Sequence, residues 1–350
     1  MTTTYDPKHP QYLDEADVRT ELTRVYDPCH GCRLCFKFCT SFPTLFEMID
    51  RHDDQDAGRL TPAQQDQVID ECFQCKLCYV NCPYIPELHE WALDFPRLML
   101  RADAMRHATG QVSLRQKATN TVMGHTDLMG KAATLAAPLA NKMISAKPDS
   151  LVRKAMQATT GVSAVRMLPP YARQRFTTWF KKRPKLRISK RQGKVAIFPT
   201  CLVEYQAPAI GHDLVKVYER NGVECTLADT TACCGAPYLH SGDMEAFTKI
   251  AEKNVKALAQ TVRKGNDIVV PQPTCGYVLK KDYVDYVGGE DATLVSQHTF
   301  DAAEYLMKLH KADGTSLDTD FTGFVPETVA YHTPCHLKAQ NIGLKSRDLI

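Results

Sequence analysis

The sequence contains two cysteine-rich stretches, CHGCRLCFKFC at residues 29–39 and CFQCKLCYVNCP at residues 72–83. Both have the spacing C-x2-C-x2-C-x3-C, in which one short loop presents three thiolates and a fourth follows further round the turn. This is the ligand spacing of a cubane 4Fe–4S cluster, and in proteins with two such clusters the fourth cysteine of each run binds the other cluster. The two runs therefore predict two 4Fe–4S clusters and one-electron redox chemistry.

This crossing rule divides the eight cysteines into two ligand sets. The first set is Cys29, Cys32, Cys35 and Cys82. The second set is Cys72, Cys75, Cys78 and Cys39. Zinc fits less well, because zinc sites use two cysteine pairs around a single tetrahedral ion. Disulfides also fit less well, because the chain has 350 residues and starts without an apolar signal-peptide core, so we expect a reducing cytosol.

Charge is distributed unevenly along the chain, although the net formal charge is only +3. Residues 1–96 hold 8 Lys+Arg against 17 Asp+Glu, and residues 195–350 hold 14 against 20. Residues 97–194 hold 21 Lys+Arg against 3 Asp. No apolar run reaches the roughly 18 residues that a membrane-spanning helix needs. The middle of the chain is therefore predicted to be a basic, helix-rich segment without a membrane span.

The 32 residues between the two cysteine runs favour helices over strands. Residues 61–64, Thr-Pro-Ala-Gln, offer an N-cap, a proline at the first helical position and a capping-box glutamine. The helix that they start should lead directly into Cys72. An earlier helix is expected over residues 43–52, and a polar lead-in with a short helix over residues 1–25. We therefore predict an α-helical two-cluster ferredoxin domain over residues 1–96.

The basic segment, residues 97–193, ends in the stretch RQRFTTWFKKR at residues 173–183. Phe176, Trp179 and Phe180 are spaced so that they share one face of a helix. Two interpretations remain open: the aromatic face packs on its own protein, or it lies on an anionic membrane surface. Nucleic-acid binding is not expected, because no other feature resembles a nucleic-acid-binding module.

From residue 194 onward, short apolar strands alternate with helices, which predicts a parallel α/β sheet. Strands are expected over residues 195–198, 223–228, 268–270 and 329–331, with helices over residues 243–264 and 301–310. Most of the remaining cysteines follow the ends of these strands, where open α/β sheets form their sites.

An internal repeat relates VAIFPTCLVEYQ at residues 195–206 to VAYHTPCHLKAQ at residues 329–340, at an offset of 134 residues. The later cysteines of the first copy have no counterparts in the second copy, because the sequence stops at Ile350. We therefore expect residues 194–350 to form a cysteine-rich domain with one complete repeat and a truncated second repeat, in which Cys335 has lost its partners.

A second cysteine constellation comprises Cys201, then Cys233-Cys234-Gly235, then Cys275. It resembles the cysteine-rich CCG domain of heterodisulfide reductase and its relatives. Together with two cubane runs, it is similar to the iron–sulfur subunits of the anaerobic glycerol-3-phosphate dehydrogenase group, and to iron–sulfur proteins of glycolate oxidation and lactate utilisation. Residues 125–130 and 137–141 also look like the helical middle of the glycerol-3-phosphate dehydrogenase protein.

This resemblance implies that the helical ferredoxin passes electrons to CCG repeats, which hold noncubane iron–sulfur clusters in heterodisulfide reductase. The matching positions here are Cys201, Cys233, Cys234 and Cys275, and Cys335 opens the second repeat. The family motif ends in Cys-x2-Cys, whereas this chain has Val278 at the last position, so the fifth ligand is missing. Either a four-cysteine cluster or a site reshaped for another acceptor remains, with Cys233 and Cys234 as the catalytic pair.

Other residues near these motifs have plainer interpretations. Cys225 fits neither motif and is expected to pack as a small buried hydrophobe. The histidines His240, His332 and His336 are expected to be satisfied residues rather than ligands. The adjacent cysteines cannot both bind one ordinary cubane without strain, so a reduced pair of core cysteines is the alternative to an irregular cluster. Gly235 would allow the backbone to approach sulfur closely and donate a hydrogen bond to it.

The resemblance implies an oxidoreductase iron–sulfur subunit, which relays electrons from a flavin dehydrogenase partner through both cubanes and the CCG site to quinone or another acceptor. No G-x-G-x-x-G is present, so hydride chemistry is expected on another polypeptide. Two alternatives remain, a thiol-disulfide reductase of the heterodisulfide type and a regulatory or sensor protein. The expected location is the cytoplasm, with peripheral binding to the anionic surface of the cytoplasmic membrane.

Overall fold

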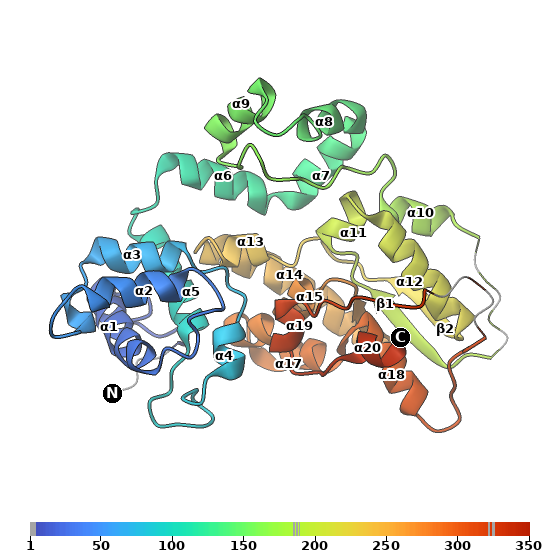
Figure 1. The fold of residues 1–350 in the computed structure, drawn as a ribbon. Helices are drawn as coiled ribbons and strands as arrows, with labels where there is room; N and C mark the ends of the chain where they lie inside the picture. The colour runs from blue at the N-terminus through green and yellow to red at the C-terminus, as the bar shows by residue number, and fades with distance from the viewer. Residues whose placement is uncertain (1–4, 185, 187, 189, 321–322, 324–325) are drawn as a thin grey trace. The chain divides into compact units, whose positions relative to one another are not determined.

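The computed structural model describes residues 5–184, 186, 188, 190–320, 323 and 326–350, and these residues form helices and one four-stranded sheet (Figure 1). They divide into two compact units. Unit 1 is Met1–Ser113, Pro237–Phe247 and Pro334–Asn341. Unit 2 is Leu114–Ala236, Thr248–Thr333 and Ile342–Ile350. This grouping reflects packing alone, and the predicted domain division at residues 96 and 193 stays a prediction.

Unit 1 is helical throughout the part that the structure describes. Its elements are α1 (Glu15–Cys32), α2 (Ser41–Asp50), the 3-10 turn η1 (Ala57–Arg59), α3 (Pro62–Asp70), α4 (Leu77–Asn81), α5 (Phe95–Ala108), most of α13 (Ala236–Leu239) and α19 (Cys335–Ala339). The predicted capping box of α3 is present, since Thr61 and Gln64 bond each other's backbone N–H. The helix ends two residues before Cys72, as the sequence predicts.

Helix α1 is longer than the short helix that the sequence suggested for residues 1–25. It has 18 residues, starts after the N-cap Asp14 and continues through Cys29 to Cys32. Its apolar residues Val18, Leu22 and Val25 recur at helical spacing and are fully buried. Burial of this stripe extends the helix into the first cysteine run, so that run begins in helical rather than loop conformation.

The core of unit 1 forms between α1, α2 and α5, and it includes the Phe42 and Phe95 rings, whose centroids lie 4.6 Å apart. Five cysteines of the two runs are partly buried and pack against this core. They are Cys29, Cys35, Cys39, Cys72 and Cys82. The predicted cluster ligands therefore lie at the edge of an apolar region, where iron–sulfur sites are shielded from water.

Unit 2 contains the predicted parallel sheet, with strand order β2-β1-β3-β4. Its strands are β1 (Gly193–Ile197), β2 (Val223–Leu227), β3 (Asp267–Val270) and β4 (Thr299–Asp301). Val195 of β1 pairs with Cys225 on one side and Asp267 on the other. Cys225 is buried in the core beneath this sheet, which confirms its interpretation as a packing residue.

The strand predicted over residues 329–331 is wrong. These residues have no regular structure, and Val329 is half exposed. The fourth strand is β4, which pairs with β3 and passes directly into α18 (Ala302–Lys311). A three-residue strand is too short to produce a period-2 pattern, and the capping box of Asp301 and Glu304 concealed it by indicating only a helix start.

Unit 2 also contains helices before, between and after its strands. They are α6 (Leu114–Gly124), α7 (Thr126–Leu135), α8 (Ala137–Ile144), α9 (Leu151–Thr160), α10 (Phe176–Lys182), α11 (Cys201–Tyr205), α12 (Pro208–Arg220), α15 (Pro273–Tyr277), the π-turn η2 (Val278–Asp282), α16 (Tyr283–Tyr286), α17 (Gly289–Gln297), α18 and α20 (Lys345–Leu349). Helix α14 (Met244–Arg263) starts in unit 1 and continues in unit 2. No helix of the described residues has both the length and the apolar character needed to cross a bilayer.

The aromatic residues of α10 pack on their own protein, which is the first of the two interpretations of this stretch. Phe176 is fully buried, and Trp179 and Phe180 pack against the same core. Trp179 lies against His212 of α12, with ring centroids 3.9 Å apart. These three side chains are therefore covered by protein and do not form an exposed aromatic face.

Candidate functional site

Four cysteines from both runs line one pocket in unit 1. Two of them lie at the end of α1, one lies in the following loop, and one follows α4. They are Cys29, Cys32, Cys35 and Cys82. The other walls are Pro28, Leu34, Phe42, Pro83, Tyr84 and Leu93. Cys39 does not line this pocket although it belongs to the first run, so the structure brings together the first predicted ligand set.

The thiols around this pocket suit a cationic ligand. Burial raises the pKa of Cys35 to about 12, and the neighbouring Cys82 and Cys32 thiolates add to the shift. Burial also raises the pKa of Cys29 and of Cys82. Crowded thiols of this kind become thiolates when positively charged iron compensates them. The backbone N–H of Tyr84 donates to Cys82 Sγ at 3.4 Å, a contact that tunes cluster potentials.

The second predicted set also lies in unit 1, and its cysteines are electrostatic neighbours of one another and of the first set, since Cys29 and Cys35 add to the burial that raises the pKa of Cys78. Burial raises the pKa of Cys72 to about 12, and Cys39 adds to the shift. Burial raises the pKa of Cys75 and of Cys78 too, and Cys39 contributes at Cys75 while Cys72 contributes at Cys78. The second run also contains a buried cation, Lys76, whose Nζ donates to Gln74 Oε1 at 2.8 Å.

Helix α19 packs on α4 within unit 1, which places Cys335 among the electrostatic neighbours of Cys75. His336 bonds the backbone carbonyl of Gln74 through Nε2 at 2.8 Å. Burial lowers the pKa of His240 to about 3, and Lys76 lowers it further, so this imidazole is neutral near pH 7. Both histidines are packed residues, as the sequence suggested, and Cys335 belongs to a different unit from the four CCG cysteines.

The four CCG cysteines are brought together in unit 2. Cys201 opens α11 after β1, and Cys275 lies in α15 after β3. Cys233, Cys234 and Cys275 are almost fully buried, and the Cys275 thiol donates to Gln272 Oε1 at 3.6 Å. The neighbouring Cys275 side chain lowers the pKa of Cys234, whereas burial raises the pKa of Cys201 to about 11 and that of Cys233 to about 12. Three segments that follow parallel strands therefore converge on one site, as expected for an α/β sheet.

The backbone of the Cys233-Cys234 pair is held by side chains that sequence reasoning missed. Asn254 Nδ2 donates to the Cys233 carbonyl at 3.0 Å, and Tyr283 Oη donates to the Cys234 carbonyl at 2.9 Å. Gly235, with φ 93°, donates its N–H to Cys233 Sγ at 3.3 Å, as expected. The sequence contained one signal for Asn254: a polar amide stands among the buried apolar residues on one face of α14, where a side chain needs a hydrogen-bond partner.

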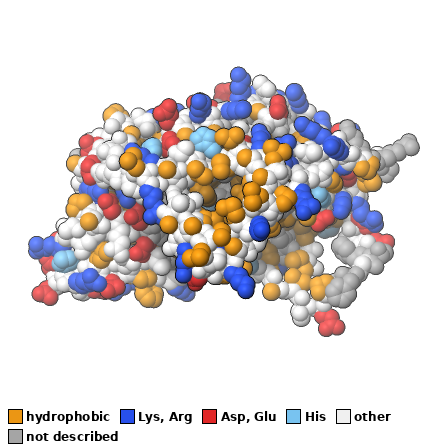
Figure 2. Space-filling view, turned by 90° about the horizontal axis from the view of Figure 1, so that it is seen from above, with side chains coloured by type: hydrophobic (Ala, Val, Ile, Leu, Met, Phe, Trp, Pro, Cys, Tyr) orange, Lys and Arg blue, Asp and Glu red, His pale blue; other side chains and the backbone are white. Residues whose placement is uncertain are grey.

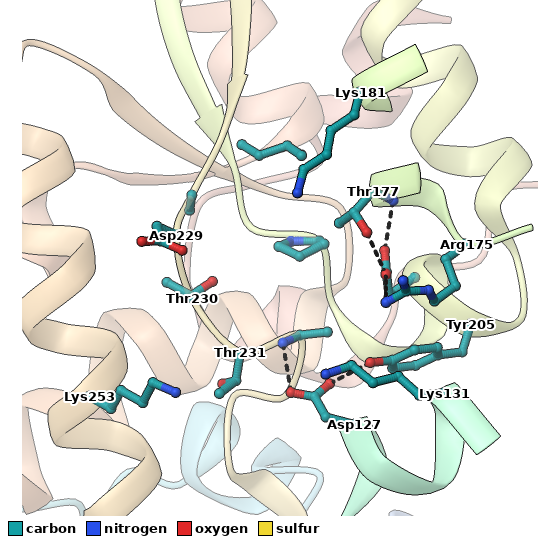
Figure 3. Close-up of a pocket in the computed structure, with 15 residues that line it drawn as sticks. Asp127, Lys131, Arg175, Thr177, Lys181, Tyr205, Asp229, Thr230, Thr231 and Lys253 are labelled. Carbon is teal, nitrogen blue, oxygen red and sulfur yellow. Dashed lines mark hydrogen bonds and ion pairs between the residues drawn. The ribbon is translucent and has the colours of Figure 1, made fainter. Parts of the chain in front are cut away.

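The loop before Cys233 is tied to the basic helical segment by Asp127 of α7. Its carboxylate accepts a hydrogen bond from Tyr205 Oη at 3.0 Å and another from the Ala232 N–H at 3.1 Å (Figure 3). Gly130 allows this approach, because a Cβ there would lie 2.4 Å from the Tyr205 ring.

Among the described residues, no group of three or more His, Cys, Asp or Glu side chains is arranged to hold a single metal ion.

Comparison with known families agrees with these observations. The family model described as "4Fe-4S dicluster domain" matches residues 21–105, and the model described as "Cysteine-rich domain", CCG, matches residues 195–280. Each model covers less than half of the chain, and together they show that the chain contains a 4Fe–4S dicluster domain and a CCG cysteine-rich domain. The dicluster domain supports iron–sulfur clusters as cofactors. No solved structure matches the chain.

Several curated proteins are similar to this chain. A subunit of the anaerobic glycerol-3-phosphate dehydrogenase of Escherichia coli (strain K12) is 30% identical over 247 residues, which cover 70% of this chain and 59% of that protein. A subunit of the fumarate reductase (CoM/CoB) of Methanothermobacter marburgensis is 30% identical over 159 residues, or 45% and 29% of the two chains. Lactate utilization protein A of Bacillus pumilus is 31% identical over 153 residues, or 41% and 58%.

The chain spans 59% of the length of the glycerol-3-phosphate dehydrogenase protein, which is less than two thirds. The similar proteins include one subunit of a dehydrogenase and one subunit of a reductase. This chain is therefore homologous to subunits of oxidoreductases, and the resemblance inferred from its cysteine motifs is confirmed.

Proposed function

We propose that this chain is an electron-transfer subunit with two 4Fe–4S clusters, which relays electrons from a flavin-containing dehydrogenase partner to quinone or another acceptor. The observation that carries this proposal is the pocket in unit 1, where Cys82 of the second run joins Cys29, Cys32 and Cys35 of the first. The relatives that are subunits of a dehydrogenase and a reductase support it. Each bound cluster would accept and release one electron at a time.

The protein's own residues would hold and tune the two clusters. The first would be held by Cys29, Cys32, Cys35 and Cys82. The second would be held by Cys39, Cys72, Cys75 and Cys78. Apolar side chains such as Phe42 and Leu93 exclude water from the first site. The Tyr84 N–H at the first site and the buried cation Lys76 at the second would stabilise negative charge on the reduced clusters.

At the CCG site, Cys201, Cys233, Cys234 and Cys275 would bind a further, noncubane iron–sulfur cluster, with Cys233 and Cys234 as the reactive pair. Convergence of the four cysteines and the Asn254 and Tyr283 hydrogen bonds support a preorganised site. Val278 stands where the family has a fifth cysteine, so only four thiolates are offered here. Cys335 stays a predicted ligand of the second repeat.

One observation favours a second function, the thiol-disulfide reductase. The neighbouring Cys275 side chain lowers the pKa of Cys234, a shift that favours a thiolate able to attack a disulfide. Reduced methyl viologen would supply the two electrons, and water the two protons, that convert a disulfide into two thiols. Turnover with viologen and no quinone would establish this function, whereas the relay requires the partner and an acceptor.

A membrane surface is the proposed location of quinone reduction. Helices α6–α9 and the loop after them expose large apolar side chains. They are Leu114, Val122, Met123, Leu128, Met129, Leu135, Leu139, Met143, Leu151, Val152, Val165 and Met167. Figure 2 shows hydrophobic side chains gathered on the face seen from above, with Lys and Arg around them. Such a surface fits an anionic bilayer, to which each nearby Lys or Arg adds about 1 kcal/mol of attraction.

Liposome flotation tests this location. Anionic vesicles should retain the protein, high salt should release it, and Leu135→Glu with Leu139→Glu should weaken retention while the clusters stay intact. The matched control is Val217→Glu, an exposed apolar position on α12 outside these helices. Equal binding to neutral and anionic vesicles would refute the attraction to an anionic surface. Absence of binding to both vesicles, or an equal loss in the control, would exclude a bilayer as the occupant of this surface.

Metal analysis with electron paramagnetic resonance tests the electron-transfer function. Protein purified without oxygen should be brown and contain about 8 iron and 8 sulfide for the two cubanes, with additional iron for the CCG site. Reduction by dithionite should produce two interacting 4Fe–4S signals. Cys234→Ala should leave these signals intact and abolish electron transfer to the acceptor, whereas Cys225→Ala, at a buried cysteine outside all sets, should change neither. Colourless protein that contains zinc or no metal would contradict the proposal.

A further inference from the structure

Beside the CCG site, unit 2 contains a second feature that electron relay does not use. It is a pocket of about 440 Å³ at the carboxyl ends of β1 and β2, lined by Pro199 after β1 and by residues 227–232 after β2 (Figure 3). Helices α7, α10 and α14 form the other walls. The volume lies within the roughly 300–1,000 Å³ of small-molecule sites, and strand carboxyl ends are where α/β sheets bind ligands.

Two carboxylates that line the pocket already accept hydrogen bonds from other residues of the protein. Asp127 accepts hydrogen bonds from Tyr205 and Ala232. Glu204 accepts from the Thr177 N–H at 2.8 Å and the Thr177 Oγ1 at 2.7 Å, and Arg175 lies 3.6 Å from it. These contacts fix the walls of the pocket, while both carboxylates keep their negative charge and, among the described residues, only Glu204 has a cation, Arg175, as an ion-pair partner. The third carboxylate, Asp229, is exposed to solvent.

Three lysines supply the other charges of the lining. They are Lys131 of α7, Lys181 of α10 and Lys253 of α14. Within the part of the chain that the structure describes, none of these three ammonium groups has a hydrogen-bond or ion-pair partner. Figure 3 shows the Lys181 and Lys253 side chains extending toward the space between them. Three helices thus place positive charge around one cavity. Together with Arg175, the three lysines give the lining four cationic side chains against the carboxylates of Asp127, Glu204 and Asp229, so the lining has a net charge of +1.

We propose that this pocket binds a small organic dianion, either a phosphate monoester or a dicarboxylate. Lys181 and Lys253 would approach the ligand from opposite walls and Lys131 from the α7 side, while the Thr230 hydroxyl would offer a shorter-range hydrogen bond. The Thr231 hydroxyl and N–H already donate to Asn254 and the Cys233 carbonyl, so they hold the wall in place. Thr230 Oγ1 is buried and has no hydrogen-bond partner among the described atoms. An incoming oxyanion would supply that partner.

The position of the pocket links the ligand to the CCG site. Its lining residue Ala232 precedes Cys233, and its lining residue Pro199 lies two positions before Cys201. The charge of a bound dianion would therefore act on the segments that carry three of the four cysteines, Cys201, Cys233 and Cys234. This inference goes beyond the proposed electron relay, because it assigns unit 2 a small-molecule site that does not depend on clusters in unit 1.

Isothermal titration calorimetry of the full, cluster-containing chain tests the proposal with two probes, ethyl phosphate and succinate. Binding of either probe supports a dianion site, and the stronger probe identifies the ligand class. Acetate, which has a single negative charge, and glycerol, which has none, should bind at least tenfold more weakly. The Lys181→Gln, Lys253→Gln double variant should weaken dianion binding about tenfold or more.

Matched controls on the same helices are Lys182→Gln and Lys256→Gln, two exposed lysines that do not line the pocket. They should change the affinity by less than about twofold, since distant surface charges contribute little at moderate salt. Absence of binding by both probes, or an equal loss in the controls, would overturn the dianion site. Iron content and resonance signals of the same preparation report separately on the electron-transfer function, so either proposal can fail alone.

Discussion

The two cysteine runs of unit 1 have the same cysteine spacing, and each contains a basic residue at the same position, but the surroundings of the two runs differ. Arg33 and Lys76 each follow the second cysteine of a run, and both have left-handed backbone conformation, with φ of 54° and 64°. The Arg33 side chain is 45% exposed and pairs with Asp50. Lys76 is only 4% exposed and bonds Gln74. Equivalent loops therefore present one solvated and one buried positive charge.

The cysteines of the two runs follow the same contrast, whereas the apolar residues between them do not. In the first run Cys32 is exposed, and Leu34 and Phe36 are 52% and 59% exposed. In the second run Cys78 is buried and α19 packs on α4, although Phe73 and Val80 are 68% and 45% exposed. Local sequence thus determines the shape of a cluster loop, whereas packing determines how strongly a charge acts on the cluster, because charges interact more strongly where water is excluded.

The largest effect should come from removing one ligand at a time from each run. Cys82→Ala should remove the same resonance signal as Cys29→Ala, because both line one pocket although they belong to different runs. Cys39→Ala should instead remove the signal that Cys72→Ala removes. Iron content should fall by up to about half in each variant. If Cys82→Ala and Cys72→Ala removed the same signal, the crossing of ligands between the runs would be refuted.

The buried cation should matter more than the exposed one. Lys76→Gln should lower the reduction potential of the second cluster by tens of mV, on the order of 50 mV, because the positive charge stabilises the reduced cluster. Arg33→Gln should lower the potential of the first cluster by no more than about 10 mV, since water and Asp50 screen this charge. Redox titration followed by electron paramagnetic resonance measures both, and equal shifts would contradict the contrast.

The two surroundings should also respond differently to pH. Burial raises the pKa of Asp103 on α5 to about 7, although Arg106 opposes the shift. Asp103 is protonated below that pKa in the folded protein but ionised above about 4 when unfolded, so stability should fall as pH rises from 4 through 7. Asp50 beside the first run has a pKa lowered to about 2 by Arg33 and His30, so its contribution is lost only in strong acid.

Urea unfolding of the anaerobic protein at pH 5 and pH 8 measures this difference. Asp103→Asn should remove roughly 2–3 kcal/mol of the pH dependence, because the amide does not ionise and the two pKa values differ over about two pH units of this range. Asp50→Asn should leave the dependence between pH 5 and pH 8 unchanged, since its carboxyl stays ionised throughout that range. An unchanged pH profile in Asp103→Asn would show that the burial of this carboxyl is without consequence.

The smallest effect concerns the residue that precedes the second cysteine of each run. Gly31 is helical with nothing within 4 Å of a Cβ position, so Gly31→Ala should raise the unfolding free energy by about 0.5 kcal/mol. Gln74→Ala should lower it by about 1 kcal/mol, because Lys76 loses a hydrogen bond. Unfolding of both variants measures the sign, and a loss of stability in Gly31→Ala would contradict this difference.

Much of this arrangement could be predicted because it depends on short-range spacing. The Thr61 capping box, the cysteine runs and the strands β1, β2 and β3 each have a local pattern that the structure bears out. The three-residue strand β4 was missed, and a strand was expected over residues 329–331, because an apolar run shows β propensity without showing whether a neighbouring strand is available.

The residues that shape the CCG surroundings could not be predicted in the same way. Asp127 holds the loop before Cys233, Asn254 bonds the Cys233 carbonyl, and Tyr283 bonds the Cys234 carbonyl. The partners in these hydrogen bonds are 21 to 105 residues apart in the sequence. Hydrogen bonds between distant segments impose no spacing on the chain. The dianion pocket has the same origin, because its three lysines lie on separate helices and only folding brings them to one cavity.

The amino-acid sequence by itself determined the two-cluster ligand spacing, the CCG pattern and the alternation that builds a parallel sheet, since each follows from the reach of a short peptide or the period of one element. Only the tertiary structure decided that Lys76 is buried while Arg33 is solvated, and that three lysines without a partner among the described residues surround a cavity beside Cys233. Burial and long-range convergence depend on which surfaces exclude water, and this is a property of the packed chain as a whole.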